Sequence, residues 1–402
     1  MHRTIILTFV GCYLPGYKMG GPIRTISNMV ERLDDELDFR IITADRDFME
    51  TKPYPNVVID GWNSVGNAKV FYASPGNRSL ISFVRLINQT PHDVLYLNSF
   101  FNPVFTIRPL LARYLSLIPK RPTVIAPRGE FSESALALKW WKKRPYLKFI
   151  RVHKLYRDIV WHASSEYEAD NIRKSIGAIA ENVVVAIVTA ADLPVIPKSI
   201  TEEEQQIAKG LGKPFRVCFL SRISPMKNLD YALRVLIAVN VPVEFSIYGV
   251  MEDDLYWRRC QELIKRLPAH VVVCYYGAID HANVVQTLAK YDLFFFPTRG
   301  ENYGHVILEA MTAGLPVLIS DQTPWRNLEA MGVGWDLSLN AEEKFCAVIE
   351  TQSKLDGGER VTQRQRIREY AKRISEDKKV IFDNIALFRD LAVNRQRSKR
   401  DL

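Results

Sequence analysis

Two glutamates have the type and spacing that first indicate a ligand site. Glu301 and Glu309 lie eight positions apart, on either side of Gly304. Apolar runs at 293–297 and 316–320 flank them, so a strand, a glycine turn, a helix and a second strand are expected in that order. A helix that begins near Gly304 would offer free backbone N–H groups and a positive dipole end, which suit a diphosphate.

Carboxylates beside a phosphate site repel the phosphates, so they need another partner. An ionised carboxylate accepts hydrogen bonds from hydroxyls, and a nucleotide sugar carries hydroxyls on both sides of its diphosphate. The alternative is a solvated helix with ordinary surface glutamates, which Gly300, Gly304 and the two apolar runs make the weaker interpretation.

Two cations follow an earlier apolar run, at 216–220. Arg222 and Lys227 are five residues apart in a predicted loop before a helix, where they could neutralise a diphosphate and the charge on a leaving group. The alternative is two solvated loop cations. Asn228 is predicted to cap the helix that follows, and Ser164 or Ser165 to cap another.

Residues 300–317 resemble the signature of the retaining glycosyltransferases of family 4, the bacterial polysaccharide-type group 1 enzymes. The resemblance implies that Glu301 lies by the sugar, that Glu309 binds the ribose, and that Arg222 and Lys227 hold the donor phosphates. The other residues that it places in the donor site on this segment are Asn302, Tyr303, Gly304 and His305.

Glycines after three other runs are further candidates for the donor site. Gly20 and Gly21 permit a close backbone approach and a helix start at Pro22, and the resemblance implies that this loop approaches the donor's phosphate and sugar. Gly249 and Gly277 each end a later run, and the resemblance implies that the second loop borders the base. An ordinary turn is the alternative.

The first half of the chain offers weaker candidates. Many members of the family have a histidine where this chain has Asn98, Ser99 and Asn102, so Asn98 is the predicted catalytic residue from this half. Arg128 and Glu130 lie in a Pro-Arg-Gly segment similar to one in the family and are predicted to bind acceptor or phosphate. A local salt-bridged turn is the alternative.

The alternation of short apolar runs with longer amphipathic stretches predicts βαβ units with buried parallel strands. The ten runs are 5–10, 39–43, 94–97, 123–126, 159–163, 216–220, 243–248, 271–276, 293–297 and 316–320. The resemblance implies an α/β chain of the GT-B fold, in which two Rossmann-like doubly wound domains face each other across a cleft. The predicted parts are an acceptor domain at 1–195, a linker at 196–213, a donor domain at 214–377, and at 378–402 a helix that crosses back to the first domain and a basic tail.

A net charge of +9 predicts an anionic partner. Residues 139–157 carry eight Lys or Arg among aromatic residues, which suits an anionic inner-membrane surface; a nucleic-acid face and an ordinary amphipathic helix are the alternatives. No nucleic acid is expected as a partner. Five scattered cysteines without a C-x-x-C pair favour reduced thiols and a cytoplasmic protein, peripheral on that membrane.

Asp45 and Asp47 match the D-x-D pattern of metal-dependent transferases, but a single D-x-D is common by chance, so neither a metal nor another cofactor is expected. The sequence as a whole predicts a retaining, metal-independent hexosyltransferase. It would move a sugar from a UDP- or GDP-sugar to a lipid-linked or saccharide acceptor in surface polysaccharide biosynthesis. The alternatives are a nucleotide-sugar epimerase of similar fold and a non-enzymatic nucleic-acid-binding protein.

Overall fold

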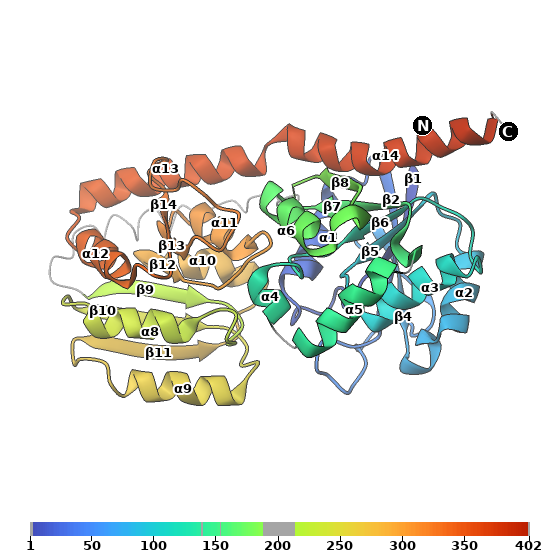
Figure 1. The fold of residues 1–402 in the computed structure, drawn as a ribbon. Coiled ribbons are helices and arrows are strands. Elements are labelled where there is room, and N and C mark those ends of the chain that lie inside the picture. The colour runs from blue at the N-terminus through green and yellow to red at the C-terminus, as the bar shows by residue number, and fades with distance from the viewer. Residues whose placement is uncertain (1–2, 138–139, 153, 188–213, 401–402) are drawn as a thin grey trace. The chain divides into compact units, whose positions relative to one another are not determined.

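A computed structural model describes residues 3–137, 140–152, 154–187 and 214–400. The chain divides into two compact units, which are described separately (Figure 1): Met1–Ala191 together with Asp377–Leu402, and Asp192–Glu376. The predicted linker at 196–213 lies outside the described residues.

The first unit is built on an eight-stranded sheet in the order β3-β4-β2-β1-β5-β6-β7-β8, parallel except for the β3–β4 pair. Its strands are β1 (Thr4–Phe9), β2 (Leu37–Ala44), β3 (Trp62–Val65), β4 (Ala68–Ala73), β5 (Val94–Asn98), β6 (Thr123–Ala126), β7 (Ile159–Ala163) and β8 (Asn182–Val185). Its α-helices are α1 (Gly21–Arg32), α2 (Leu80–Gln89), α3 (Arg108–Tyr114), α4 (Glu133–Ala137), α5 (Trp140–Val152), α6 (Glu166–Ile176) and α14 (Lys378–Arg400).

The second unit is built on a parallel sheet in the order β11-β10-β9-β12-β13-β14. Its strands are β9 (Phe215–Leu220), β10 (Val243–Tyr248), β11 (Val271–Gly277), β12 (Leu293–Phe296), β13 (Val317–Ser320) and β14 (Gly334–Leu337). The helices described in it are α8 (Leu229–Ala238), α9 (Asp254–Ile264), α10 (Val284–Leu288), α11 (His305–Thr312), α12 (Glu342–Ser353) and α13 (Gly357–Ser375). All ten predicted apolar runs are strands of one sheet or the other, which confirms two doubly wound α/β units.

One of the two predicted helix caps is correct. Ser165 accepts a hydrogen bond from the Glu168 amide at 3.1 Å and so caps α6. Asn228 stands at the cap position of α8, but its side chain does not cap the helix. Its backbone is left-handed, with φ of 63°, and its amide group instead donates to the carbonyl of Pro297 at 2.9 Å.

The last helix, α14, packs into the core of the first unit. Phe388 is fully buried, and its ring centroid lies 6.4 Å from that of Phe39 and 5.0 Å from that of Tyr96. Leu387 joins the same cluster. The helical backbone continues through the basic residues near the end to Arg400. No helix in the described parts of the chain combines the length and the hydropathy that a membrane crossing needs.

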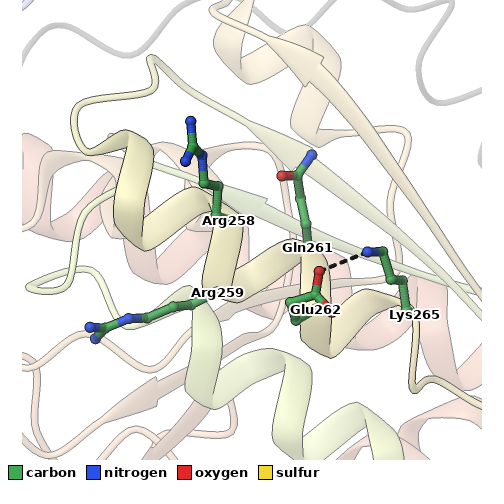
Figure 2. A pocket seen from close by; sticks show the side chains of 5 residues that line it. All are labelled: Arg258, Arg259, Gln261, Glu262 and Lys265. Carbon is green, nitrogen blue, oxygen red and sulfur yellow. Dashed lines mark hydrogen bonds and ion pairs between the residues drawn. The ribbon is translucent and has the colours of Figure 1, made fainter.

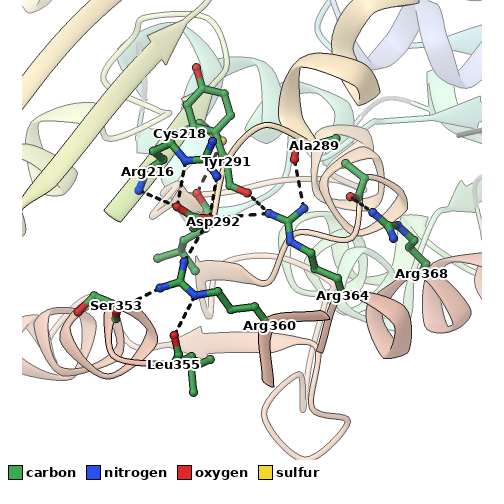
Figure 3. Close-up of polar contacts among 12 residues, drawn as sticks. Arg216, Cys218, Ala289, Tyr291, Asp292, Ser353, Leu355, Arg360, Arg364 and Arg368 are labelled. Atoms are coloured by element: carbon green, nitrogen blue, oxygen red, sulfur yellow. Dashed lines mark hydrogen bonds and ion pairs between the residues drawn. The ribbon is translucent and has the colours of Figure 1, made fainter. Parts of the chain in front are cut away.

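A buried carboxylate surrounded by arginines fixes α13 to the second sheet (Figure 3). Asp292 accepts hydrogen bonds from the Arg216 guanidinium at 3.0 Å, and Arg360 approaches it at 3.3 Å. Arg364 lies 3.9 Å away and donates to the carbonyl of Ala289 at 3.1 Å. The side chains of Asp292 and Arg364 are only 6% and 7% exposed. One carboxylate therefore serves three arginines from two elements, β9 and α13.

Candidate functional site

The order of strands in the second unit creates a switch point beside its first strand. The chain runs from β9 outward through β10 to β11, and then returns to place β12 on the other side of β9. The loops that follow β9 and β12 therefore meet at the carboxyl edge of the sheet, where ligands bind in open α/β sheets. The predicted cations lie on the first of these loops, and Glu301 lies on the second.

Hydrogen bonds join these two loops. The side-chain carbonyl of Asn228 accepts from Arg299 Nε at 2.9 Å, and its amide donates to Pro297, as described above. The Arg299 backbone amide also donates to the carbonyl of Met226 at 2.9 Å. Because Asn228 is buried and bonded on both sides, it holds the neighbouring Lys227 at a fixed place relative to the second loop.

The structure brings Lys227 and Glu301 into direct contact. Lys227 Nζ forms an ion pair with Glu301 Oε1, and the two side chains are only 12% and 15% exposed. The ammonium group also lies 5.7 Å from the centroid of the Phe296 ring. The predicted phosphate cation and the predicted sugar carboxylate are thus neighbours, as they would have to be to bind adjacent parts of one ligand.

Arg222, the second predicted cation, has a different partner. Its Nη1 lies 3.0 Å from each carboxylate oxygen of Glu252, with the two side chains 35% and 27% exposed. Backbone bonds between Ile223 and Val250, at 2.8 Å, and between Glu252 and Ile223, at 3.2 Å, join these two loops. Sequence reasoning missed Glu252, because no spacing rule connects it to Arg222.

Gly249 is required by a close approach of two backbones. Its φ is +140°, and a Cβ there would lie 1.7 Å from the carbonyl oxygen of Ser221. Its amide donates to the carbonyl of Gly277 at 2.7 Å, and Gly277 itself has φ of +74° with open space beside it. The loops after β9, β10 and β11 therefore contact one another through main-chain atoms, and any side chain at Gly249 would separate them.

Helix α11 begins as predicted, directly after Gly304. This glycine has φ of 79° and ψ of 57°, and it has no side chain with which to cap the first turn. The carbonyl of the buried Tyr303 accepts from Trp325 Nε1 at 2.5 Å, and its ring centroid lies 4.8 Å from that of His305. Asn302 is half-buried. The aromatic contacts fix the direction in which the positive end of α11 points.

Glu309 is the fifth residue of α11 and its side chain is 14% exposed. Its Oε1 lies 3.9 Å from His281 Nδ1, and His281 belongs to the short turn η5 (His281–Asn283) that follows β11. Sequence reasoning missed His281, which no motif marks. A ligand bound by Glu309 would have this half-exposed imidazole beside it.

In the first unit, the glycine loop before α1 leaves open space. Gly20 has φ of +63°, and a Cβ at Gly20 or Gly21 would meet no atom within 4 Å. The Asp47 carboxylate holds the loop from the side, because it accepts from the amides of Tyr17 at 2.9 Å and Lys18 at 3.2 Å.

Both carboxylates of the D-x-D pattern bind other groups of the protein. Asp47 holds the glycine loop, and Asp45 forms ion pairs with Arg46 at 2.9 Å and Arg78 at 2.7 Å. Within the described ranges, no three histidine, cysteine or acidic side chains gather where they could hold a metal ion.

Asn98 and Arg128 are brought together. Asn98 is buried, and its side-chain carbonyl accepts from Arg128 Nη2 at 3.0 Å. Arg128 also donates to Tyr96 Oη at 2.5 Å, which lies 2.9 Å from His162 Nδ1. His162 Nε2 reaches the carbonyl of Ala186 at 2.8 Å. Since a carbonyl only accepts, Nε2 carries the proton and Nδ1 accepts from the tyrosine.

The carboxylate of Glu130 accepts hydrogen bonds from other groups of the protein, whereas the sequence predicts that it binds acceptor or phosphate. Its carboxylate accepts from Ser99 Oγ at 2.7 Å and from the amides of Phe100 at 2.5 Å and Phe101 at 3.0 Å. Burial raises the pKa of this carboxyl group, and the three donors oppose the rise. Glu130 thus shapes the loop after β5, which also carries Ser99, and we do not retain it as a direct ligand contact.

The buried His162 predicts a loss of stability in acid. Burial lowers its pKa from 6.5 to about 3, and the nearby Arg128 adds to the effect. Below pH 6.5 the unfolded chain binds a proton that the folded chain does not, so stability is lost as the pH falls toward 3. Each pH unit would cost at most about 1.4 kcal/mol. Urea titrations at several pH values should show a shallower pH dependence for His162→Gln than for the wild type.

A hollow of about 370 Å³ lies on α9 (Figure 2). Its lining residues are Arg258, Arg259, Gln261, Glu262 and Lys265. Four of them belong to α9, and Lys265 follows its last residue. None of the five is a predicted site residue, and Glu262 and Lys265 pair with each other at 2.7 Å. This hollow is a solvated helix face, and the loops at the switch point remain the candidate site.

Comparison with known proteins relates the chain to sugar transferases. Residues 200–374 match the family described as glycosyl transferases group 1. The chain is 24% identical over 311 residues to a 41.2 kDa protein in the cps region of Klebsiella pneumoniae, covering 75% of this chain and 78% of that one. It is 27% identical over 111 residues to the O-antigen chain mannosyltransferase B of Escherichia coli, covering 26% and 28%.

A solved structure shows the same fold. HepE of Anabaena, crystallised with UDP and glucose, superposes with a TM-score of 0.70 at 17% identity and covers 97% of this chain and 100% of that one. The matched segment contains Arg222, Lys227, Glu301 and Glu309, the residues that the loops of the second unit bring to one edge of its sheet. Residues 200–374 therefore carry a glycosyl transferases group 1 domain, and the chain is a glycosyltransferase of the GT-B fold.

Proposed function

We propose that the protein is a retaining hexosyltransferase that takes its sugar from UDP-sugar. The observation that carries this proposal is the contact between Lys227 and Glu301 at the switch point, with α11 beginning four residues beyond Glu301. A cation, a carboxylate and a helix N-terminus at one place match a diphosphate joined to a hydroxyl-rich sugar. HepE, whose crystal structure contains UDP and glucose, supports UDP over the alternatives.

The proposed mechanism assigns each charge to one part of the donor. Lys227, Arg222 and the start of α11 stabilise the diphosphate as the glycosidic bond breaks. Glu301 accepts hydrogen bonds from sugar hydroxyls, and Glu309 accepts them from the ribose. The leaving phosphate oxygen takes the acceptor's proton on the same face, so the reaction retains configuration and needs neither a protein base nor a metal ion.

We propose that the first unit supplies the acceptor site. Asn98 is the last residue of β5 and Arg128 follows β6, so both lie at the carboxyl edge of that sheet. An arginine fork suits a phosphate or carboxylate, so the acceptor is a saccharide or a lipid-linked saccharide. The relatives in the cps region and in O-antigen chain synthesis support a role in surface polysaccharide assembly.

The exposed side chains of helix α5 support the proposal that the enzyme is cytoplasmic and peripheral on an anionic membrane. Trp140 and Trp141 are 54% and 58% exposed, and Arg144 lies 5.2 Å from the Trp140 ring centroid. Lys148 continues the same helix face at the next four-residue step. Exposed rings with interleaved cations suit lipid headgroups. Lys139 falls outside the described residues.

This surface predicts a measurable vesicle affinity. The double variant Trp140→Ala with Trp141→Ala should lose most binding to vesicles that contain phosphatidylglycerol, because the rings no longer bury area at the headgroups. Sedimentation with vesicles would measure it, with Met49→Ala, another exposed apolar residue of this unit, as the matched control. Unchanged sedimentation of the double variant would place the membrane surface elsewhere.

The proposed function is tested by equilibrium binding of UDP, GDP and ADP, with and without EDTA. We expect EDTA-insensitive binding of UDP that Arg222→Ala weakens. Binding of none of the three, or binding that depends on a metal ion, would overturn the donor assignment. Product analysis then separates a glycosylated acceptor from an epimerised donor.

The pair of Arg222 with Glu252 predicts a variant that binds UDP more tightly than the wild type, whereas Arg222→Ala is expected to bind it more weakly. To bind a diphosphate, Arg222 must exchange the carboxylate of Glu252 for phosphate oxygens. Glu252→Gln removes the competing charge and the repulsion of the ligand, so UDP should bind about three- to tenfold more tightly. Calorimetry would measure the change, and Glu262→Gln on the exposed face of α9 is the matched control. Weaker UDP binding by Glu252→Gln would show that Arg222 needs this partner to be positioned.

A further inference from the structure

The first sheet has a solvated patch where helices ordinarily cover both faces of parallel strands. In β2 the burial alternates at the start, with Asp38 and Arg40 partly exposed, and becomes continuous from Ile41 onward. Strand β4 shows the same change, with Lys69 exposed near its start. The starts of these two strands and the edge strand β3 therefore present polar side chains on one face.

A hollow of about 600 Å³ lies over this patch. The lining residues that bear on its chemistry are Arg3, Asp38, Arg40, Trp62, Ser64 and Lys69. All of them come from β2, β3, β4 and the residue before β1, and none is a residue of the candidate donor or acceptor site. The volume falls within the range of about 300–1,000 Å³ that small-molecule sites occupy.

The charges of the lining favour an anion. Three cations, Arg3, Arg40 and Lys69, face one carboxylate, Asp38. All three cations are held in place. Arg3 Nη1 donates to the carbonyl of Asp34 at 2.6 Å. Arg40 Nη1 donates to the carbonyl of Pro91 at 3.0 Å and Nη2 to Asp38 at 3.3 Å, while Lys69 Nζ donates to Ser64 Oγ at 2.7 Å. A positioned guanidinium beside an ammonium group suits a carboxylate.

The remaining groups favour a sugar as the carrier of that anion. Trp62 is 38% exposed, and its ring meets the edge of Phe71 at 5.6 Å between centroids, so its orientation is fixed. A sugar ring presents a face of C–H groups that packs on an aromatic ring. The Asp38 carboxylate repels any anion, so it favours a ligand that also offers hydroxyl groups, from which it accepts hydrogen bonds. A sugar carries several such hydroxyls, whereas a DNA backbone has none.

We propose that this patch, which consists of Trp62, Arg40, Lys69 and Asp38, binds an acidic oligosaccharide through its carboxylate and one sugar ring. The Trp62 ring takes the apolar face of a sugar unit, Arg40 and Lys69 take the carboxylate, and Asp38 takes hydroxyls. The site lies within the first unit and uses none of the residues proposed for transfer, so it does not depend on the proposed function.

The test is calorimetric titration of the full chain with trigalacturonic acid, with maltotriose as the neutral probe and a hexathymidylate as the phosphate probe. We expect the acidic trisaccharide to bind and the other two to bind at least about tenfold more weakly. Trp62→Ala and Lys69→Gln should each weaken binding about fivefold to tenfold. Matched controls in the same unit are Trp141→Ala and Lys52→Gln, at exposed positions outside the patch, which should bind as the wild type does.

Three outcomes would overturn the proposal: no binding of trigalacturonic acid, binding that Trp62→Ala and Lys69→Gln leave unchanged, or tighter binding of the hexathymidylate. Saturating UDP and the Arg222→Ala variant should not alter the titration. A failure of the donor assignment would therefore appear in the UDP experiment alone, and a failure of this site in the trisaccharide experiment alone.

Discussion

Replacing either cation of the switch-point loop should lower kcat by about 10²- to 10³-fold. Lys227→Met and Arg222→Met each remove one positive group from the place where charge develops on the leaving diphosphate, and a preorganised charge acts mainly in the transition state. The Lys227 variant should be the more severe. Lys227 is the more buried of the two and its partner Glu301 would lose its counter-ion, whereas Arg222 is more exposed.

Steady-state kinetics with a UDP-sugar would measure these effects. Arg259→Met is the matched control, because Arg259 is an exposed arginine of the same unit on the hollow of Figure 2, and we expect it to retain full kcat. Urea denaturation should show all three variants to be folded. If both switch-point variants keep wild-type kcat, these cations do not stabilise the leaving group and the proposed mechanism is wrong.

Asp292→Asn should destabilise the protein by about 3 kcal/mol. Asparagine keeps the shape of the side chain but removes the charge that Arg216, Arg360 and Arg364 share (Figure 3). The three guanidinium groups would then repel one another around a nearly buried neutral amide, a situation that costs far more than the loss of a surface pair. Discounting Arg216 and Arg360, which are about a quarter exposed, keeps the expected cost at the lower end of the usual range.

The free energy of unfolding of the full chain, measured in urea, would test this expectation. Glu262→Gln is the matched control, because it removes one acidic group from an exposed pair with Lys265, and it should leave the midpoint unchanged. Equal midpoints for Asp292→Asn and the wild type would show that backbone carbonyls alone, such as that of Ala289, are sufficient to hold the arginines.

Most of the fold could be predicted because buried parallel strands are continuous apolar runs. The four strands that were missed lack that pattern. In β3 and β8 the burial alternates between exposed and half-buried residues, and β14 is mostly half-buried. Near the start of strand β4 the exposed Lys69 lies between the buried Ala68 and Val70, so its apolar run is short. A strand at the edge of a sheet can be partly exposed, so its sequence needs no continuous apolar run. Such strands are recognised only in the complete sheet.

The candidate site was predictable where residues lie close in sequence and not where they meet through folding. The start of α11 at Gly304 follows from local glycine chemistry. The pairing of Lys227 with Glu301 joins two loops that only the strand order makes adjacent, although both residues were identified separately. Glu252 and His281 carry no motif, and Glu130 belongs to the right segment but faces the amides of the neighbouring loop.

The first unit is assembled from both ends of the chain, and this has a consequence for biosynthesis. The cluster that contains Phe39 and Tyr96 is completed by Phe388, which leaves the ribosome only after the whole second unit has been made. The nascent first sheet therefore has an apolar face open to solvent while the nearly two hundred residues of the second unit are synthesised. A chain that stops after Glu376 would keep the second unit whole and leave the first one exposed to chaperones and proteases.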